Sequence, residues 1–254
     1  MNILITNDDG IYAEGIYKLA CSLENIGDVF VVAPNRQRSA TGHAITMHEP
    51  IRAEKIKFFD KNFNAWSISG TPADCVKLGT QALMKVKPDV VFSGINNGPN
   101  LGTDVLYSGT VSAAMEGVIL GYPAVAVSLA AFKDLNYDYA SEFCCMLAQK
   151  IAQNPLPPDT LLNVNIPNCK KQDIKGVKAT ILGVRKYKNS FVERIDPRGQ
   201  AYYWLGGEIL DEKKDEETDI YSIQNKYVSI TPIHFDLTKF DIIQEIEKWS
   251  MHIL

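Results

Sequence analysis

Two adjacent carboxylates, Asp8 and Asp9, lie just after the short apolar run Asn2 to Thr6, inside the tetrapeptide Asn-Asp-Asp-Gly. Ionising two neighbouring carboxylates is costly unless a cation lies between them or one of them keeps its proton. Turn formation is the competing interpretation, because Asn, Asp and Gly favour tight turns. The position of the pair at the end of a predicted strand favours a functional role, since ligands bind beyond the carboxyl ends of parallel strands.

Further oxygen donors occur in two other polar loops. Ser39 lies in the loop 35–43, and Asn96 lies in the Gly- and Asn-rich loop 93–109. Each residue alone is compatible with an ordinary loop or turn. Together with the two aspartates they form an all-oxygen set, which suits Mg²⁺, Mn²⁺ or Ca²⁺ rather than zinc or copper. Such an ion can hold a phosphate oxygen and lower the pKa of a bound water.

A phosphate site is predicted where the loop 93–109 becomes a helix, at Ser108, Gly109 and Thr110. Free backbone N–H groups and the helix dipole make such a helix start attractive to anions. Ser108 is also a good N-cap residue, and the two roles are compatible. His43 follows Ser39 by four residues and is a candidate for binding phosphate or acting as a general acid. A structural histidine bonded to the loop backbone is the alternative.

The order of predicted elements places these loops at one edge of a sheet. A strand over 2–6, a helix from 15 and a strand over 28–33 form a βαβ unit, which implies parallel strands. Further strands are predicted over 89–92, 123–128 and 161–166, with helices over 110–120 and 139–152 between them. Residues 45–69 suggest a hairpin insert. Thr71-Pro72 predicts the start of another helix. The fold class is therefore α/β, a mostly parallel sheet flanked by helices.

The C-terminal part differs in character and predicts a β-rich extension. Residues 175–207 are rich in aromatic and basic side chains, and 211–219 form an acidic stretch that predicts a solvated loop. A strand over 227–231 and a helix over 239–252 close the chain. We predict a single domain with a core of about 1–170 and 226–254 and an arm of about 175–225.

Composition excludes several classes of protein. The 254 residues carry a net charge of −4 without a basic block, which argues against binding to duplex nucleic acid. No apolar run approaches the ~20 residues that span a bilayer, and no signal peptide is evident, so we expect a cytoplasmic protein without membrane contact. The five scattered cysteines indicate structural thiols in a reducing compartment.

Five sequence blocks resemble the SurE family, the survival protein E nucleotidases. The blocks are NDDG, RSATGHAIT, SGTPADCV, SGINNGPNLG and LYSGTVSAAMEG, in order and with matching separations. The resemblance implies a Rossmann-like core, one divalent cation per subunit, with Mg²⁺ or Mn²⁺ favoured, and hydrolysis of nucleoside monophosphates. It implies metal ligands at Asp8, Asp9, Ser39 and Asn96, and phosphate contacts at Ser108, Gly109 and Thr110.

The resemblance also bears on assembly and substrate range. It implies a homodimer or homotetramer in which subunits exchange the C-terminal arm. It further implies a 5′- or 3′-nucleotidase, some members of the family also acting on short polyphosphate.

These observations lead to a hypothesis of single displacement by water, with Asp8 and Asp9 as the catalytic residues. Asp9 takes the proton of the attacking water, and the helix start stabilises the equatorial phosphate oxygens. A covalent aspartyl-phosphate is the mechanistic alternative. A dinucleotide-dependent oxidoreductase is disfavoured, because the motif GxGxxG does not follow the first strand. A non-catalytic nucleotide-binding module stays open as the alternative function.

Overall fold

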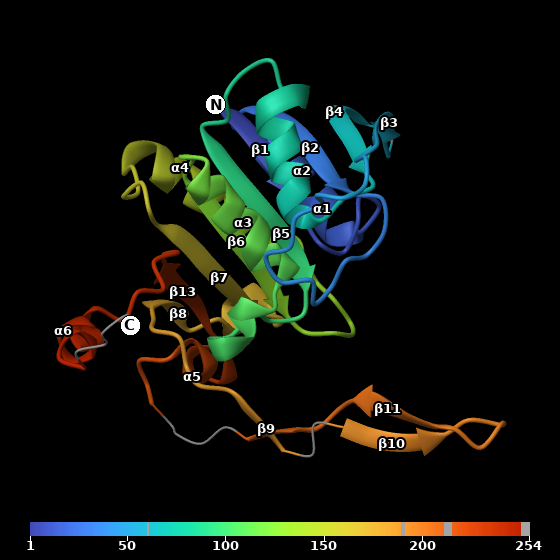
Figure 1. The fold of residues 1–254 in the computed structure, drawn as a ribbon. Helices are drawn as coiled ribbons and strands as arrows, with labels where there is room; N and C mark the ends of the chain where they lie inside the picture. Colours follow the sequence, from blue (N-terminus) through green and yellow to red (C-terminus); the bar gives the residue numbers. More distant parts are fainter. Residues whose placement is uncertain (60, 189–190, 211–214, 250–254) are drawn as a thin grey trace.

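A nine-stranded sheet forms the centre of the molecule (Figure 1), and the computed structural model describes residues 1–59, 61–188, 191–210 and 215–249. The strands, in their order across the sheet, are β3 (Ala53–Phe58), β4 (Lys61–Ile68), β2 (Asp28–Pro34), β1 (Asn2–Thr6), β5 (Val90–Asn97), β6 (Ala124–Ala130), β7 (Leu161–Pro167), β13 (Tyr227–Ile233) and β8 (Gly176–Ala179).

The strands from β4 to β7 run parallel, which confirms the predicted mostly parallel sheet. Except in β4, their residues are largely buried, as expected when helices cover both faces of a parallel sheet. Only the strands toward the two edges break the pattern, since β3 is antiparallel to β4 and β13 is antiparallel to β7. The strand order reverses between β1 and β5, and this is the point where an open α/β sheet binds its ligand.

Helices cover both faces of the sheet. Helices α1 (Glu14–Leu23) and α4 (Asp138–Gln153) pack together over one hydrophobic core, and α2 (Pro72–Leu78) and α3 (Gly109–Ile119) pack over the other. The close approach of α1 to β5 requires glycine at position 15, because a Cβ there would lie 2.0 Å from the Ile95 carbonyl oxygen. The predicted capping of α2 is confirmed, since the Thr71 side chain accepts a hydrogen bond from the Asp74 amide.

The structure adds detail to the predicted local structure and corrects it at the end of β5. Strand β5 continues to Asn97 instead of ending at residue 92, because its last residues pair with β6 beyond a bulge. The predicted hairpin is present as β3–β4, and it forms an edge of the main sheet, since β4 pairs with β2. The loop after β5 contains a 3₁₀ helix at Gly102–Leu106, and a π-helical turn at Gly79–Leu83 extends α2.

The C-terminal part contains a protruding arm, which covers fewer residues than the predicted segment 175–225. Strands β9 (Lys186–Lys188), β10 (Phe191–Ile195), β11 (Ala201–Leu205) and β12 (Glu208–Leu210) form two antiparallel pairs, and the β10–β11 hairpin extends away from the sheet (Figure 1). Strand β8, by contrast, belongs to the main sheet.

The remaining elements show where the predicted acidic loop and the closing helix differ from the structure. Helix α5 (Asp219–Gln224) begins at a fully buried Asp219, so the predicted solvated loop ends before this residue, and its residues 211–214 lie outside the described part. The predicted helix 239–252 is present as a 3₁₀ turn at Phe240–Ile242 and α6 at Ile243–Glu247, while residues 250–252 lie outside the described part. A 3₁₀ turn at Lys171–Asp173 follows β7.

Two further expectations can be compared with the structure. All five cysteines are free thiols in this structure, and Cys75 and Cys144 are buried. None of the described helices combines the length and the apolar character needed to cross a membrane.

Candidate active site

The two aspartates lie at the carboxyl end of β1, beside the end of β5. Asp8 is 4% exposed, and its Oδ1 accepts a hydrogen bond of 2.6 Å from the Thr110 hydroxyl at the start of α3. The preceding helix residue, Gly109, permits this contact, because a Cβ there would lie 2.8 Å from the Asp8 Cβ. The chain therefore brings the first predicted loop and the predicted phosphate site into direct contact.

Burial raises the pKa of Asp8 from its ordinary value of 3.8 to about 6, the Thr110 hydrogen bond opposes this rise, and the charge of Asp9 adds to it. Burial also raises the pKa of Asp9, against the lowering effect of the Asn97 amide. Ionising both carboxylates therefore costs more free energy than usual, and positive charge nearby would lower that cost. A divalent cation would provide that charge.

The raised pKa of Asp8 predicts a pH-dependent cost in the metal-free protein. Between pH 3.8 and about 6 the folded state binds more protons at this group than the unfolded state, so stability falls as pH rises through this window. Asp8→Asn removes that cost and is expected to raise the free energy of unfolding at pH 7.5 by on the order of 3 kcal/mol. Urea unfolding in EDTA at pH 7.5 and pH 4 measures the difference, which should vanish at pH 4. A variant no more stable than the wild type at pH 7.5 would contradict the assignment.

Ser39 joins the aspartates through one glutamine. The Gln37 amide nitrogen lies 2.9 Å from the Ser39 hydroxyl and 3.5 Å from Asp9 Oδ1, and it serves as donor in both contacts. The same loop is tied to the first one by the Arg38 amide, which donates to the Asp8 carbonyl oxygen at 2.7 Å. The structure thus brings Ser39 to the aspartates as predicted, while its role as a metal ligand stays a prediction.

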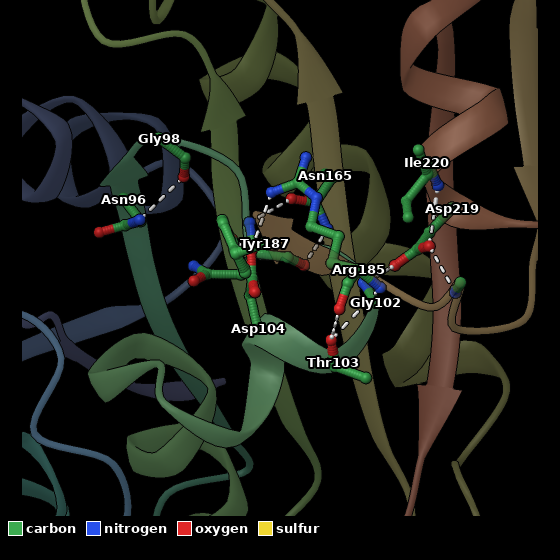
Figure 2. Close-up of polar contacts among 12 residues, drawn as sticks. Asn96, Gly98, Gly102, Thr103, Asp104, Asn165, Arg185, Tyr187, Asp219 and Ile220 are labelled. Carbon is green, nitrogen blue, oxygen red and sulfur yellow. Dashed lines mark hydrogen bonds and ion pairs between the residues drawn. The ribbon is translucent and has the colours of Figure 1, made fainter. Parts of the chain in front are cut away.

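Asn96 presents its amide oxygen away from the protein backbone. Its Nδ2 donates to the Gly98 carbonyl oxygen at 2.8 Å, and Figure 2 shows the side-chain oxygen on the opposite side, outside this hydrogen bond. The following residue, Asn97, donates its amide to Asp9 Oδ2 at 2.9 Å, which ties the end of β5 to the carboxylate pair. The amide oxygen of Asn96 is therefore available to a ligand.

The start of α3 has the geometry of an anion site. The Ser108 hydroxyl caps the helix by accepting a hydrogen bond of 3.1 Å from the Val111 amide, which confirms the capping interpretation. The amides of Gly109 and Thr110 belong to the first turn, where backbone N–H groups have no intrahelical acceptor. Phosphate binding at Ser108, Gly109 and Thr110 stays a prediction.

Among the residues that the structure describes, His43 forms a hydrogen bond with neither the loop backbone nor Asp8 or Asp9. Its Nε2 lies 2.9 Å from Oε2 of Glu116, a nearly buried residue of α3 that also pairs with Lys77 Nζ at 3.2 Å. The hydrogen bond from His43 is the largest influence on Glu116 and lowers its pKa. His43 and His234 both line an apolar cavity of about 700 Å³ beside α3. The geometry gives His43 a structural partner that the sequence did not indicate.

The donor set fits a hard cation. Among the described residues, no group of three or more His, Cys, Asp or Glu side chains could hold a metal ion. Two carboxylates with neutral hydroxyl and amide oxygens beside them match the preference of Mg²⁺ and Mn²⁺ for oxygen ligands and retained water. Any further ligands would come from neutral oxygens such as those of Ser39 and Asn96.

Sequence reasoning missed Gln37 and the backbone amide of Asn97. A glutamine within a polar loop gives no signal that distinguishes it from a solvated side chain. A backbone donor gives no signal at all, because every non-proline residue has one. The position of Gln37 follows from the pairing of β1 with β2, and that of Asn97 from the pairing of β1 with β5, which the sequence predicts only in outline.

Comparison with known proteins finds relatives that match this chain over nearly its whole length. The sequence model described as "Survival protein SurE" matches residues 3–189. The 5′-nucleotidase SurE of Alkaliphilus metalliredigens is 54% identical over 252 residues, which cover 99% of each chain. The 5′-nucleotidase SurE of Heliobacterium modesticaldum is 51% identical over 98% of this chain and 92% of that protein. The crystal structure of SurE protein from Aquifex aeolicus has a TM-score of 0.88 and 42% identity, covering 99% of this chain and 100% of that one.

Proposed function

Because this chain belongs to the SurE family, we propose that it is a metal-dependent 5′-nucleotidase, which hydrolyses nucleoside monophosphates to nucleoside and phosphate. The observation that carries the proposal is the contact between Asp8 and Thr110. It places a pair of carboxylates against a helix start suited to anions, at the point where the strand order reverses. A carboxylate pair beside a phosphate site is what metal-assisted phosphoryl transfer requires.

Different residues of the chain have different roles in the proposed reaction. Asp8, Asp9, Ser39 and Asn96 would hold one divalent cation, Mg²⁺ or Mn²⁺, which when bound supplies positive charge to the phosphate and acidifies water. Asp9 is more accessible than Asp8, and it takes the proton of the attacking water. The backbone amides of Gly109 and Thr110 and the Ser108 hydroxyl stabilise the equatorial phosphate oxygens.

A covalent aspartyl-phosphate is less well supported. Asp8 is buried, and one of its two carboxylate oxygens already accepts the Thr110 hydroxyl. Attack on phosphorus by this carboxylate would compete with that hydrogen bond. Direct attack by water needs no such change.

The arm supports a proposal about assembly. Both strands of the β10–β11 hairpin expose large apolar side chains, namely Phe191, Val192, Ile195, Tyr202, Tyr203, Trp204 and Leu205. Exposed apolar surface on this scale marks an interface. We therefore propose that the protein forms a homodimer or homotetramer in which the subunits exchange their arms. We also propose that it is located in the cytoplasm. Activity on 3′-nucleotides and short polyphosphate is part of the same proposal.

A phosphate-release assay tests the proposed function. Purified protein is incubated with a panel of 5′- and 3′-nucleoside monophosphates, first with EDTA and then with Mg²⁺ or Mn²⁺ in excess. We expect release to fall to background in EDTA and to return with either ion, since both accept oxygen ligands. Release that persists in EDTA would contradict metal dependence. Binding of nucleotide without release under every condition would favour the non-catalytic binding module.

A further inference from the structure

The loop from Gly98 to Tyr107 connects the two halves of the proposed site. Asn96 precedes it at the end of β5, and the helix start at Ser108 follows it. Its shape therefore sets the position of the proposed cation ligand relative to the proposed phosphate site. Two separate regions of the protein hold this loop in place.

The first half of the loop is held by the core strands. The Asn100 amide donates to Asn165 Oδ1 at 2.8 Å, and its side chain donates to the Ser128 hydroxyl at 2.7 Å. The Asn100 carbonyl oxygen accepts hydrogen bonds from the side-chain amides of Asn163 and Asn165, both at 2.9 Å. These partners lie on β6 and β7, so this half is fixed to the rigid sheet.

The second half is held by the C-terminal region, beginning with Asp219. This carboxylate is fully buried, and it accepts hydrogen bonds from the Gly102 amide at 2.7 Å and the Gly183 amide at 2.9 Å. Figure 2 shows Asp219 beside Gly102 of the loop. The two backbone segments are so close that a Cβ on Gly102, whose φ is +55°, would lie 2.6 Å from the Gly183 carbonyl oxygen.

Arg185 and Tyr187 add a second attachment at the base of the arm. Asp104 Oδ2 accepts hydrogen bonds from Arg185 Nη1 at 2.8 Å and from the Tyr187 hydroxyl at 2.6 Å (Figure 2). The Thr103 hydroxyl donates to the Arg185 carbonyl oxygen at 3.0 Å. The Arg185 side chain is only 12% exposed, so this ion pair is shielded more than a surface pair.

We propose that Asp219, Arg185 and Tyr187 are positioning residues for the hydrolysis, an inference that rests on the proposed function. They act through the loop, since they hold Gly102 to Asp104 and thereby fix where α3 begins relative to Asn96. Phosphoryl transfer depends on this alignment, because displacements near 1 Å can cost about 10²-fold in rate. Because Tyr187 lies in β9, a strand of the arm, its hydrogen bond to Asp104 connects the arm to the loop beside the site.

Steady-state kinetics with Mg²⁺ and a 5′-nucleoside monophosphate test the proposal. For Arg185→Met we expect kcat per folded molecule to fall about tenfold, and for the milder Tyr187→Phe about threefold, with KM changed less than twofold. Tyr221→Phe is the matched control. It also removes a hydrogen bond from a tyrosine hydroxyl to a carboxylate, here that of Glu216, which among the described residues forms no hydrogen bond with the loop. Its kcat should equal that of the wild type.

Hydrogen exchange in EDTA gives a readout that does not depend on activity. Peptides covering 101–107 should exchange faster in Arg185→Met and Tyr187→Phe than in the wild type, because the amides there lose their restraint. A purely structural role would instead lower the melting temperature and leave kcat per folded molecule unchanged. The proposal is overturned if Tyr187→Phe, whose partly exposed side chain should tolerate the change, matches the wild type in both measurements.

Failure of this inference is distinguishable from failure of the proposed function. If Asp9→Asn abolishes turnover while the Arg185 and Tyr187 variants keep normal kinetics and exchange, the positioning role alone is wrong. If Asp9→Asn retains full turnover, the proposed active site itself is wrong, and the positioning role assigned to these residues falls with it.

Discussion

Asp9→Asn is expected to lower the rate of phosphate release about 10³-fold, because the variant loses both the proposed base and one negative charge facing the cation. The fold should survive, since an asparagine oxygen can still accept the hydrogen bond of the Asn97 amide. Phosphate release at saturating Mg²⁺ measures the rate, and the melting temperature in EDTA reports on the fold.

Asp196→Asn provides a matched control for this experiment. The Asp196 carboxylate also accepts backbone hydrogen bonds, from the amides of Arg198 and Gln200, but it lies in the turn of the β10–β11 hairpin. Its replacement removes the same charge without touching the site. A rate for Asp9→Asn within tenfold of the wild type would reject Asp9 as the base, and an equal loss in Asp196→Asn would point to a general effect of charge.

The parallel core was predictable because its signals are local. Apolar runs such as Val90–Phe92 and helical spacing after Gly15 each identify an element without knowledge of its neighbours. The continuation of β5 to Asn97 was not predictable, because Ser93–Asn97 has the composition of a loop. Those residues are strand only because β6 offers partners beyond the bulge, which is a tertiary effect.

The same distinction applies to the site. Asp8, Asp9, Ser39 and Asn96 could be named from the sequence, because each follows a predicted strand and carries a hard oxygen donor. Asp219 could not, because it lies in an acidic stretch that has the composition of a solvated loop. Its burial results from the approach of Gly102 and Gly183, which are 81 residues apart in the numbering of the chain. Contacts of this kind leave no local pattern.

Gly109→Ala is the second substitution with a large expected effect, although the change adds only one methyl group. Alanine has a higher helix propensity than glycine, so helix propensity alone predicts a neutral or stabilising change in α3. The new Cβ would instead lie 2.8 Å from the Asp8 Cβ and 2.9 Å from Asp8 Oδ2, and one of the two residues must move. Movement of either separates the carboxylate pair from the phosphate site, and we expect kcat/KM to fall about 10²-fold.

Gly206→Ala separates this steric effect from the general effect of replacing a glycine. A Cβ at Gly206 meets only a methyl group of Val192, at 3.3 Å, in the arm. Kinetics and thermal unfolding of both variants give the comparison, with normal kcat/KM expected for Gly206→Ala. Normal kcat/KM in Gly109→Ala would mean that Asp8 and the helix start need not touch during turnover. The contact is expected to matter because Asp8 is only 4% exposed, accepts the Thr110 hydroxyl at 2.6 Å and lies against Gly109.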